Sequence, residues 1–235
     1  MGREKIVRGQ EREIIYDEDR FKLLESMRDR AKKLFEMFKK ERINCLTYGS
    51  IARGNVRETS DIDILITRKI PTYRIGLILE QNSIIPITRK IVQATPNNVI
   101  KINYELAGEV SISVPMTDFT RQGLEFYKFG GCLNYKELMA DKRVPGVDKR
   151  LVLIIPTEKG HKERSLLMMR YDASKIIGVS QEMINQRIRV LNKRDKVGRT
   201  GVFLERDMHP SENAEEVLRN LARENHLIRK RLNQK

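Results

Sequence analysis

The sequence predicts an α/β or α+β domain, in which helices flank a mixed sheet, followed by a mainly helical domain. Short apolar runs bounded by glycine, proline or aspartate alternate with helical patterns in the first half of the chain. After Pro115 the pattern changes to short helices and a higher density of cations. We therefore predict a domain at residues 1–118, with an N-terminal helix, and a basic C-terminal domain at residues 119–235.

The first element is an amphipathic helix at 17–41, where Asp17 is a suitable N-cap and apolar residues recur at helical spacing. The other elements expected in the first domain are strands at 43–48, 61–67, 87–94, 99–105 and 109–114 and a helix at 71–82. Those expected in the second domain are helices at 119–128, 135–140, 161–177, 180–193 and 214–232 and strands at 150–156 and 202–204.

The net charge of +14 is concentrated in the C-terminal part of the chain. From Phe119 onward there are 25 Lys and Arg against 15 Asp and Glu. Such a surplus favours polyanionic partners, either nucleic acid or nucleotide phosphates, although a highly charged surface is also common in thermophile proteins. No stretch is apolar enough for a membrane span, and Cys45 and Cys132 cannot complete a structural zinc site. We expect a cytoplasmic protein that does not associate with membranes.

Two short segments carry residues suited to phosphate and metal chemistry. Gly49 ends an apolar run at a point where the absence of Cβ lets the backbone approach a ligand, and Ser50 follows where a helical turn can hold an anion. Asp61 and Asp63 are two residues apart on an expected strand, so they share one face. Paired carboxylates repel unless a cation lies between them, and oxygen ligands of this kind suit Mg²⁺.

The order Gly49-Ser50, a ten-residue spacer, and Asp61-Ile62-Asp63 resembles the signature of the polymerase-beta-type nucleotidyltransferase superfamily. The resemblance implies two Mg²⁺ (or Mn²⁺) ions that activate an acceptor hydroxyl for attack on the α-phosphate of a nucleoside triphosphate. It assigns both metals to Asp61 and Asp63 and the β- and γ-phosphates to Ser50. Arg53 and Ser60 are further candidate nucleotide contacts, with a solvated loop residue as the alternative for each.

Members of the superfamily usually carry a third carboxylate on a later strand, and here the position aligned to it is Ser111. Glu109 is two residues earlier and is expected to share the face of Ser111, so we take it as the third catalytic and metal-binding residue. Glu105, on the preceding strand, is the next candidate. The alternative is a site that binds nucleotide but does not catalyse.

The segment 161–204 resembles a helix-turn-helix followed by the basic turn and strand of a winged helix. Gly178 takes the turn, Ser180 caps the second helix, and Gln181, Asn185 and Arg189 would face a groove. The residues expected to contact nucleic-acid phosphates are Arg187, Arg189, Lys193, Arg194, Lys196 and Arg199. The alternative is a structural helical pair with a solvated basic face.

We therefore predict a metal-dependent nucleotidyltransferase that transfers a nucleoside monophosphate to a hydroxyl. The basic C-terminal half would hold RNA or DNA as acceptor, while small-molecule and protein acceptors stay open. The alternative is a regulator that binds nucleic acid and whose transferase domain is a degenerate nucleotide sensor. The sequence does not indicate an oligomeric state.

Overall fold

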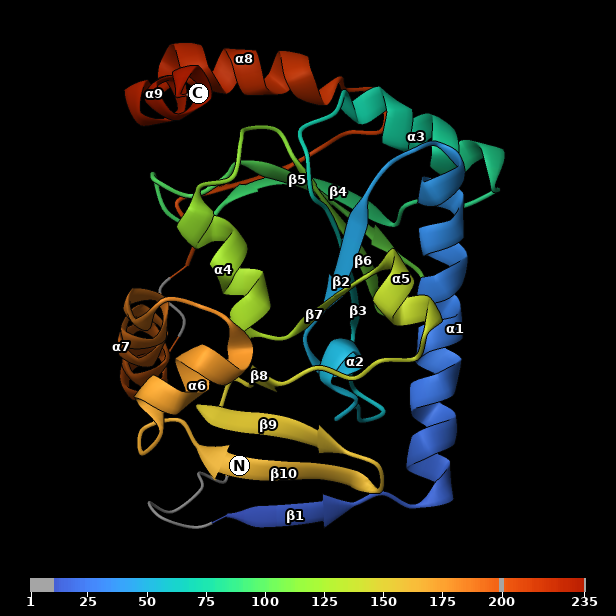
Figure 1. Ribbon diagram of the computed structural model, residues 1–235. Coiled ribbons are helices and arrows are strands. Elements are labelled where there is room, and N and C mark those ends of the chain that lie inside the picture. Colours follow the sequence, from blue (N-terminus) through green and yellow to red (C-terminus); the bar gives the residue numbers. More distant parts are fainter. Residues whose placement is uncertain (1–10, 199–200, 235) are drawn as a thin grey trace. The chain divides into compact units, whose positions relative to one another are not determined.

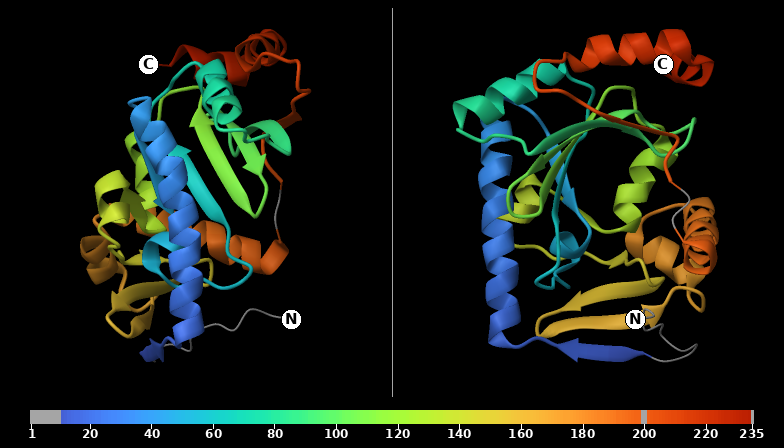
Figure 2. Two further views of the ribbon diagram at one scale, coloured as in Figure 1. Left: turned by 90° about the vertical axis from the view of Figure 1, so that its right-hand side faces the viewer. Right: turned by 180° about the vertical axis from the view of Figure 1, so that it is seen from behind.

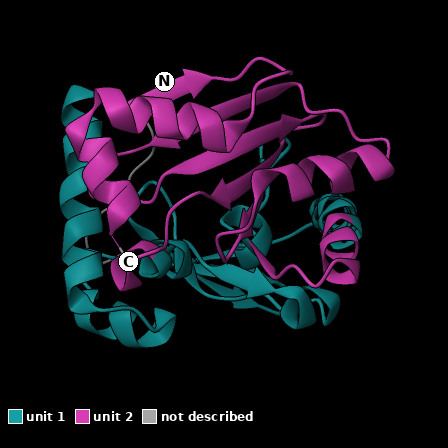
Figure 3. Ribbon diagram, turned by 90° about the horizontal axis from the view of Figure 1, so that it is seen from above, with its two compact units in different colours: residues 1–33, 47–62, 124–200 teal, residues 34–46, 63–123, 201–235 magenta. Residues whose placement is uncertain are grey.

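A computed structural model describes residues 11–198 and 201–234 of the chain. The chain forms two compact units: unit 1 is residues 1–33, 47–62 and 124–200, and unit 2 is residues 34–46, 63–123 and 201–235 (Figure 3). The chain thus passes between the units several times. The sequence predicts a single domain boundary between residues 118 and 119, and this boundary stays a prediction. Within the described residues, no helix has both the length and the apolar character that crossing a membrane requires.

Unit 1 contains a four-stranded antiparallel sheet with the order β1-β10-β9-β8 (Figures 1 and 2). Its strands are β1 (Arg12–Ile15), β8 (Gly146–Val147), β9 (Val152–Thr157) and β10 (Gly160–Ser165). In the register of this sheet, Glu163 of β10 lies between Ile154 of β9 and Arg12 of β1. The sheet therefore joins the beginning of the described chain to a hairpin that is about 150 residues distant along the sequence.

Two helices, α6 (Arg170–Ile177) and α7 (Gln181–Val197), contribute to the apolar core of unit 1. Gly178 ends α6 in the left-handed conformation with φ 74°, and the Ser180 side chain accepts a hydrogen bond from the Met183 amide at 3.2 Å. The predicted glycine turn and serine cap are confirmed. The fully buried members of the core include Leu153, Leu166 and Ile184.

The predicted helix at 161–177 is wrong in its first part, because residues 160–165 form β10. The buried face of this strand consists of His161, Glu163 and Ser165, all of them polar. A hydrogen bond of 2.7 Å joins His161 Nδ1 and the Tyr16 hydroxyl, and Arg150 forms an ion pair with Glu163. An alternation in which the inward residues are polar gives no hydrophobic period of two, so the strand could not be recognised from apolar spacing.

Unit 2 contains strands in the order β11-β4-β5-β6-β3. Figure 1 labels the last four of them. These strands are β3 (Ile62–Ile66), β4 (Thr88–Gln93), β5 (Lys101–Leu106), β6 (Val110–Pro115) and β11 (Leu204–Asp207). The pairs β11-β4, β4-β5 and β5-β6 are antiparallel. The predicted strand at 202–204 is therefore not the wing of a winged helix, since β11 instead extends the sheet of unit 2.

Helices α3 (Thr72–Gln81), α8 (Ala214–Glu224) and α9 (His226–Asn233) complete unit 2. Glu215 of α8 accepts hydrogen bonds from the backbone amide of Thr72 at 2.6 Å and from its hydroxyl at 2.8 Å, which places a carboxylate at the N-terminus of α3. The single helix predicted at 214–232 is two helices. Asn225 interrupts it by capping α9, with its side chain accepting from the Leu227 amide at 2.9 Å.

Several elements carry the chain from one unit to the other: α1 (Glu18–Lys40), β2 (Cys45–Tyr48), the first residue of β3, and α4 (Arg121–Phe129). A further short strand, β7 (Cys132–Asn134), lies in unit 1. The short helices α2 (Ser50–Arg53) and α5 (Tyr135–Met139) belong to unit 1. The predicted α/β class, with flanking helices and further helices toward the C-terminus, is confirmed.

Candidate functional site

Gly49 lies at the end of β2 in a backbone conformation that favours glycine, with φ 84° and ψ −142°. Its amide donates to the Gly131 carbonyl at 2.9 Å, and its carbonyl accepts from the Arg53 amide at 3.1 Å. A Cβ built on Gly49 would have no atom within 4 Å. The glycine is therefore required by its conformation rather than by crowding, and the space beside it is open to a ligand, as the sequence predicts.

Arg28 of α1 fixes the helical turn that follows Gly49. Its guanidinium donates to the Ile51 carbonyl at 3.0 and 3.2 Å, to the Ala52 carbonyl at 3.4 Å and to the Lys142 carbonyl at 2.7 Å. Only 3% of Arg28 is exposed, and burial lowers its pKa to about 10. These bonds satisfy the carbonyls at the end of α2, so the position of Ser50 at its start depends on Arg28.

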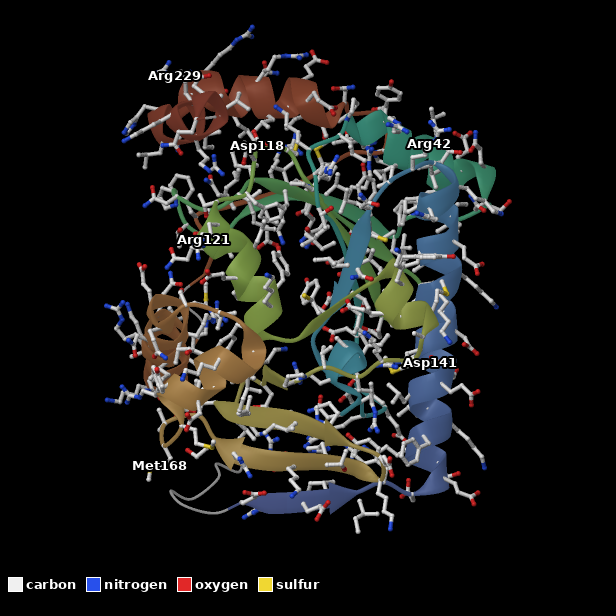
Figure 4. The ribbon with its side chains drawn as sticks, viewed as in Figure 1. Arg42, Asp118, Arg121, Asp141, Met168 and Arg229 are labelled. Atoms are coloured by element: carbon white, nitrogen blue, oxygen red, sulfur yellow. The ribbon has the colours of Figure 1, made fainter. Side chains whose placement is uncertain are left out.

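The sequence carries a signal for Arg28 that our prediction did not use. Arg28 lies on the buried stripe of α1, beside the buried Leu24, Met27 and Ala31. A cation on the apolar face of a helix indicates a buried polar partner. A second basic contact of the same helix joins Lys32 to Asp141 at 2.8 Å, and Asp141 is labelled beside α1 in Figure 4.

Arg53 does not reach outward as a free nucleotide contact. It is 6% exposed and donates to the Asn55 side chain at 3.0 Å and to the Gly130 carbonyl. Burial lowers its pKa to about 10. Arg53 therefore holds the loop around Gly130, and the predicted phosphate contact is replaced by a structural one.

Ser60 is also engaged in its own loop, where its hydroxyl accepts from the Arg57 amide at 2.9 Å. Asp61 follows it as an exposed residue directly before β3. Both residues belong to unit 1, together with Gly49 and Ser50. The glycine-serine turn and Asp61 therefore lie in the same unit.

Asp63 is the second residue of β3, in unit 2, and is partly buried. The Ser111 hydroxyl on β6 donates to Asp63 Oδ1 at 2.6 Å. A hydroxyl that donates to a carboxylate stabilises its ionised form. The residue aligned to the missing third carboxylate is therefore a hydrogen-bond partner of Asp63 rather than a charged neighbour.

Glu109 does not lie on the strand that was predicted to carry it. β6 begins at Val110, and Glu109 is an exposed turn residue with φ 59°. Gly108 also has a positive φ, and residues 107–109 form the tight turn of the β5-β6 hairpin. Glu109 therefore has no support as a partner of Asp61 and Asp63. Across residues 11–198 and 201–234, no three His, Cys, Asp or Glu side chains are placed to hold a metal ion.

The register of β5 and β6 instead places Glu105 directly opposite Ser111, so both share a sheet face. Lys101 and Asn103 continue this face along β5. The Lys101 ammonium donates to Ser113 Oγ at 3.3 Å, and the Ser113 hydroxyl donates to Asn103 Oδ1 at 2.9 Å. Burial lowers the pKa of Lys101, and the negative charge of Asp63 opposes that lowering. The polar residues at every second position of β5 are the signal from which this face could have been predicted.

The basic residues predicted in 161–204 fall into two groups. Arg187 is partly buried in unit 1, with its guanidinium 4.8 Å from the centre of the Phe126 ring, and burial lowers its pKa to about 10. Gln181 also turns inward and donates to Ser174 Oγ at 2.5 Å. Of the residues predicted to face or contact nucleic acid, those exposed on α7 are Asn185, Arg189, Lys193, Arg194 and Lys196. Glu182, Asn192, Asp195 and Val197 are exposed on the same helix. Arg199 lies outside the described residues.

Comparison with known protein families shows that residues 23–139 match the model of a family described as "nucleotidyltransferase domain". This region extends from α1 to α5 and contains every candidate nucleotide and metal residue. No curated protein and no solved structure matches the chain significantly.

Proposed function

Because this chain belongs to the polymerase-beta-type nucleotidyltransferase superfamily, we propose that it transfers a nucleoside monophosphate from a nucleoside triphosphate to a hydroxyl group. The observation that carries the proposal is the hydrogen bond from the Ser111 hydroxyl to Asp63 Oδ1 at 2.6 Å, on a residue two positions after Asp61. Two adjacent carboxylates with oxygen-only donors fit a divalent cation that completes its shell with water and phosphate oxygens.

In the proposed complex, Asp61 and Asp63 hold Mg²⁺ or Mn²⁺ against the triphosphate. When bound, the ion offsets the charge that develops on the phosphates. Ser50 contacts the β- and γ-phosphates, and the open space beside Gly49 admits them. The acceptor oxygen forms a bond to the α-phosphorus while the bond to pyrophosphate breaks, and the electron pair of that bond leaves with pyrophosphate. The hydroxyl proton passes to water, because Ser111 offers no carboxylate to accept it.

The acceptor is proposed to be RNA or DNA, held through the exposed cations of α7. These are Arg189, Lys193, Arg194 and Lys196. They repeat on a helix whose opposite side forms part of the core, so their heads are presented to solvent. No described aromatic side chain is exposed on α7, and phosphate contact is the form of binding that this face suits. We expect the protein to work in the cytoplasm.

The experiment is incubation with each labelled nucleoside triphosphate, Mg²⁺ or Mn²⁺, and in separate reactions RNA, DNA, protein extract or small hydroxyl compounds. We expect pyrophosphate release with label on one acceptor class, and loss of both in Asp61→Ala/Asp63→Ala. Lys90→Ala is the matched control, because Lys90 pairs with Glu205 and Asp207 elsewhere in the sheet. Release that persists in the double variant would contradict the proposal.

A second candidate function is favoured by the serine at the third-carboxylate position. In this alternative the chain binds a nucleoside triphosphate and nucleic acid but acts as a sensor. Ser111 cannot accept a proton from an acceptor hydroxyl as a carboxylate does, which would slow transfer without preventing nucleotide binding. Saturable nucleotide binding, without pyrophosphate release in the presence of any acceptor, would support the sensor over the enzyme.

A further inference from the structure

The turn at Gly49 and Ser50 is held by another segment of unit 1, the Gly130-Gly131 dipeptide that follows α4. The Gly131 carbonyl accepts a hydrogen bond from the Gly49 amide at 2.9 Å, and the Gly130 carbonyl accepts one from the guanidinium of Arg53. Two consecutive carbonyls thus bind the residue before α2 and the last residue of that helix. A shift of this dipeptide would therefore shift Gly49, from which the backbone continues to Ser50.

Gly146 of β8 packs its backbone directly against this dipeptide. A Cβ built on Gly146 would lie 2.5 Å from the Gly131 nitrogen, 2.6 Å from the Gly130 carbonyl carbon and 2.7 Å from the Gly130 oxygen. These atoms belong to the backbone, so no side chain fits at Gly146 unless the dipeptide moves. A Cβ on Gly131 would in turn meet Arg53 Cγ at 2.9 Å and the Pro145 carbonyl oxygen at 3.1 Å. The position of the dipeptide therefore depends on glycine at both places.

The segment that contains Gly146 also contacts the turn directly. The Val144 amide donates to the Ala52 carbonyl of α2 at 3.2 Å. Residues 144–146 thus contact α2 at its third residue and the dipeptide that binds Gly49. A backbone that is held in one conformation before its ligand arrives loses less conformational entropy on binding, so contacts of this kind favour affinity.

We propose that Gly146 and Arg53 are positioning residues for the triphosphate, because together they hold the Gly130-Gly131 dipeptide where its carbonyl fixes Gly49. The inference rests on the proposed function, in which Ser50 and the space beside Gly49 receive the phosphates. It gives both residues an effect on nucleotide affinity, although neither has a phosphate contact in the proposed complex.

The test combines two readouts on Gly146→Ala and Arg53→Met, neither of which needs turnover. The first is hydrogen exchange of the Gly49 amide, measured by nuclear magnetic resonance without nucleotide. We expect slow exchange in the unmodified protein and at least about tenfold faster exchange in each variant, because the Gly131 carbonyl moves away. The second is calorimetric titration with Mg²⁺ and α,β-methylene analogues of the four nucleoside triphosphates. We expect affinity to weaken at least about tenfold in each variant, the effect of losing one hydrogen bond to a charged group.

Ile184→Ala is the matched control, since it opens a cavity in the apolar core of the same unit. It should lower the thermal midpoint and leave both readouts unchanged when they are measured below that midpoint. If Gly146→Ala does not fold, Arg53→Met decides alone, because it changes a different contact of the same dipeptide.

Two results would overturn the inference while the unmodified protein still binds an analogue. One is an affinity that stays unchanged in the folded variants, and the other is an affinity that weakens equally in Ile184→Ala and so follows stability alone. Unchanged exchange of the Gly49 amide in both Gly146→Ala and Arg53→Met would overturn it as well. If the unmodified protein binds no analogue at all, the proposed function itself is overturned, and the inference with it.

Discussion

The Ser111 hydroxyl donates a hydrogen bond to Asp63 Oδ1 at 2.6 Å, and this contact shows how the site differs from a three-carboxylate arrangement. The serine orients the Asp63 side chain through this hydrogen bond but adds no charge. Glu109, which the sequence offered as a substitute, lies in the turn before β6. The site therefore depends on two carboxylates and on the groups that hold the neighbouring turn.

Replacing Arg28 with alanine should lower the free energy of unfolding by about 2–4 kcal/mol, because the carbonyls of Ile51 and Lys142 would lose their buried donor. The Ala52 carbonyl would keep its bond from the Val144 amide. Arg28→Lys should recover less than half of this difference, since one ammonium cannot match the fork of a guanidinium. Urea denaturation measures both variants, with the exposed Lys33→Ala on the same helix as control. A decrease below about 0.5 kcal/mol, the usual size of a surface effect, would contradict a structural role for Arg28.

Gly49→Ala should cost about 1–3 kcal/mol of stability through backbone strain alone, because φ 84° with ψ −142° is a region that residues with a Cβ avoid. A steric clash is not expected, since no atom lies within 4 Å of the added Cβ. Gly76→Ala is the matched control: it also meets no atom within 4 Å, but it lies within α3, where alanine stabilises. Thermal unfolding measures the stability of both variants. If Gly49→Ala and Gly76→Ala changed the stability equally, backbone strain at Gly49 would be contradicted.

Glu163→Gln should remove a pH dependence of stability at low pH. Hydrogen bonds from His161 and Arg150 lower the pKa of Glu163 from 4.5 to about 2, against the opposing effect of burial. A lowered carboxylate pKa adds stability that is present above pH 4.5 and is lost as the pH falls toward 2. The gap in stability between the unmodified protein and Glu163→Gln should therefore narrow over that window. Glu158→Gln, at an exposed position, should show no such narrowing.

Much of the fold could be predicted from the sequence, and the failures have a common physical cause. The helix α1 could be predicted because its apolar residues recur at helical spacing. The candidate site could be predicted because Gly49-Ser50 and Asp61-Asp63 lie close together in the sequence. β10 was mistaken for a helix because its buried residues are polar and find their partners on distant segments. Arg53 was misjudged for the same reason, because its guanidinium donates to the carbonyl of Gly130, which is far along the chain.

The prediction that Glu109 lies on the strand of Ser111 was wrong because of its immediate neighbours in the sequence. Counting two residues back from Ser111 assumes that the strand continues, but Gly108 and Glu109 both adopt positive φ and close the β5-β6 hairpin. The same hairpin brings Glu105 opposite Ser111, a pairing that depends on the turn type. Register across a hairpin could not be obtained from alternation within either strand alone.

The two groups of cations on α7 lead to opposite predictions. Lys193→Ala/Arg194→Ala should leave the thermal midpoint unchanged. For RNA or DNA binding, the negative slope of log K against log salt should become less steep, by about 0.9 for each duplex phosphate that is no longer neutralised. Arg187→Ala should instead lower the stability, because its guanidinium packs over the Phe126 ring. Fluorescence anisotropy at several salt concentrations measures the first effect and calorimetric unfolding the second. A salt slope unchanged in the double variant would contradict phosphate binding by this helix.

The measurement that tests the central claim most directly is isothermal titration of α,β-methylene nucleoside triphosphates into the protein, with and without Mg²⁺. We predict saturable binding that requires Mg²⁺ and that weakens at least about 100-fold in Asp61→Ala/Asp63→Ala, because the metal would then have neither carboxylate ligand. Asp207→Ala, which removes an aspartate that pairs with Lys90 on β4, should leave the affinity unchanged. Nucleotide binding that is independent of Mg²⁺, or that is equally tight in the double variant, would contradict the assignment of Asp61 and Asp63 as the metal-triphosphate site.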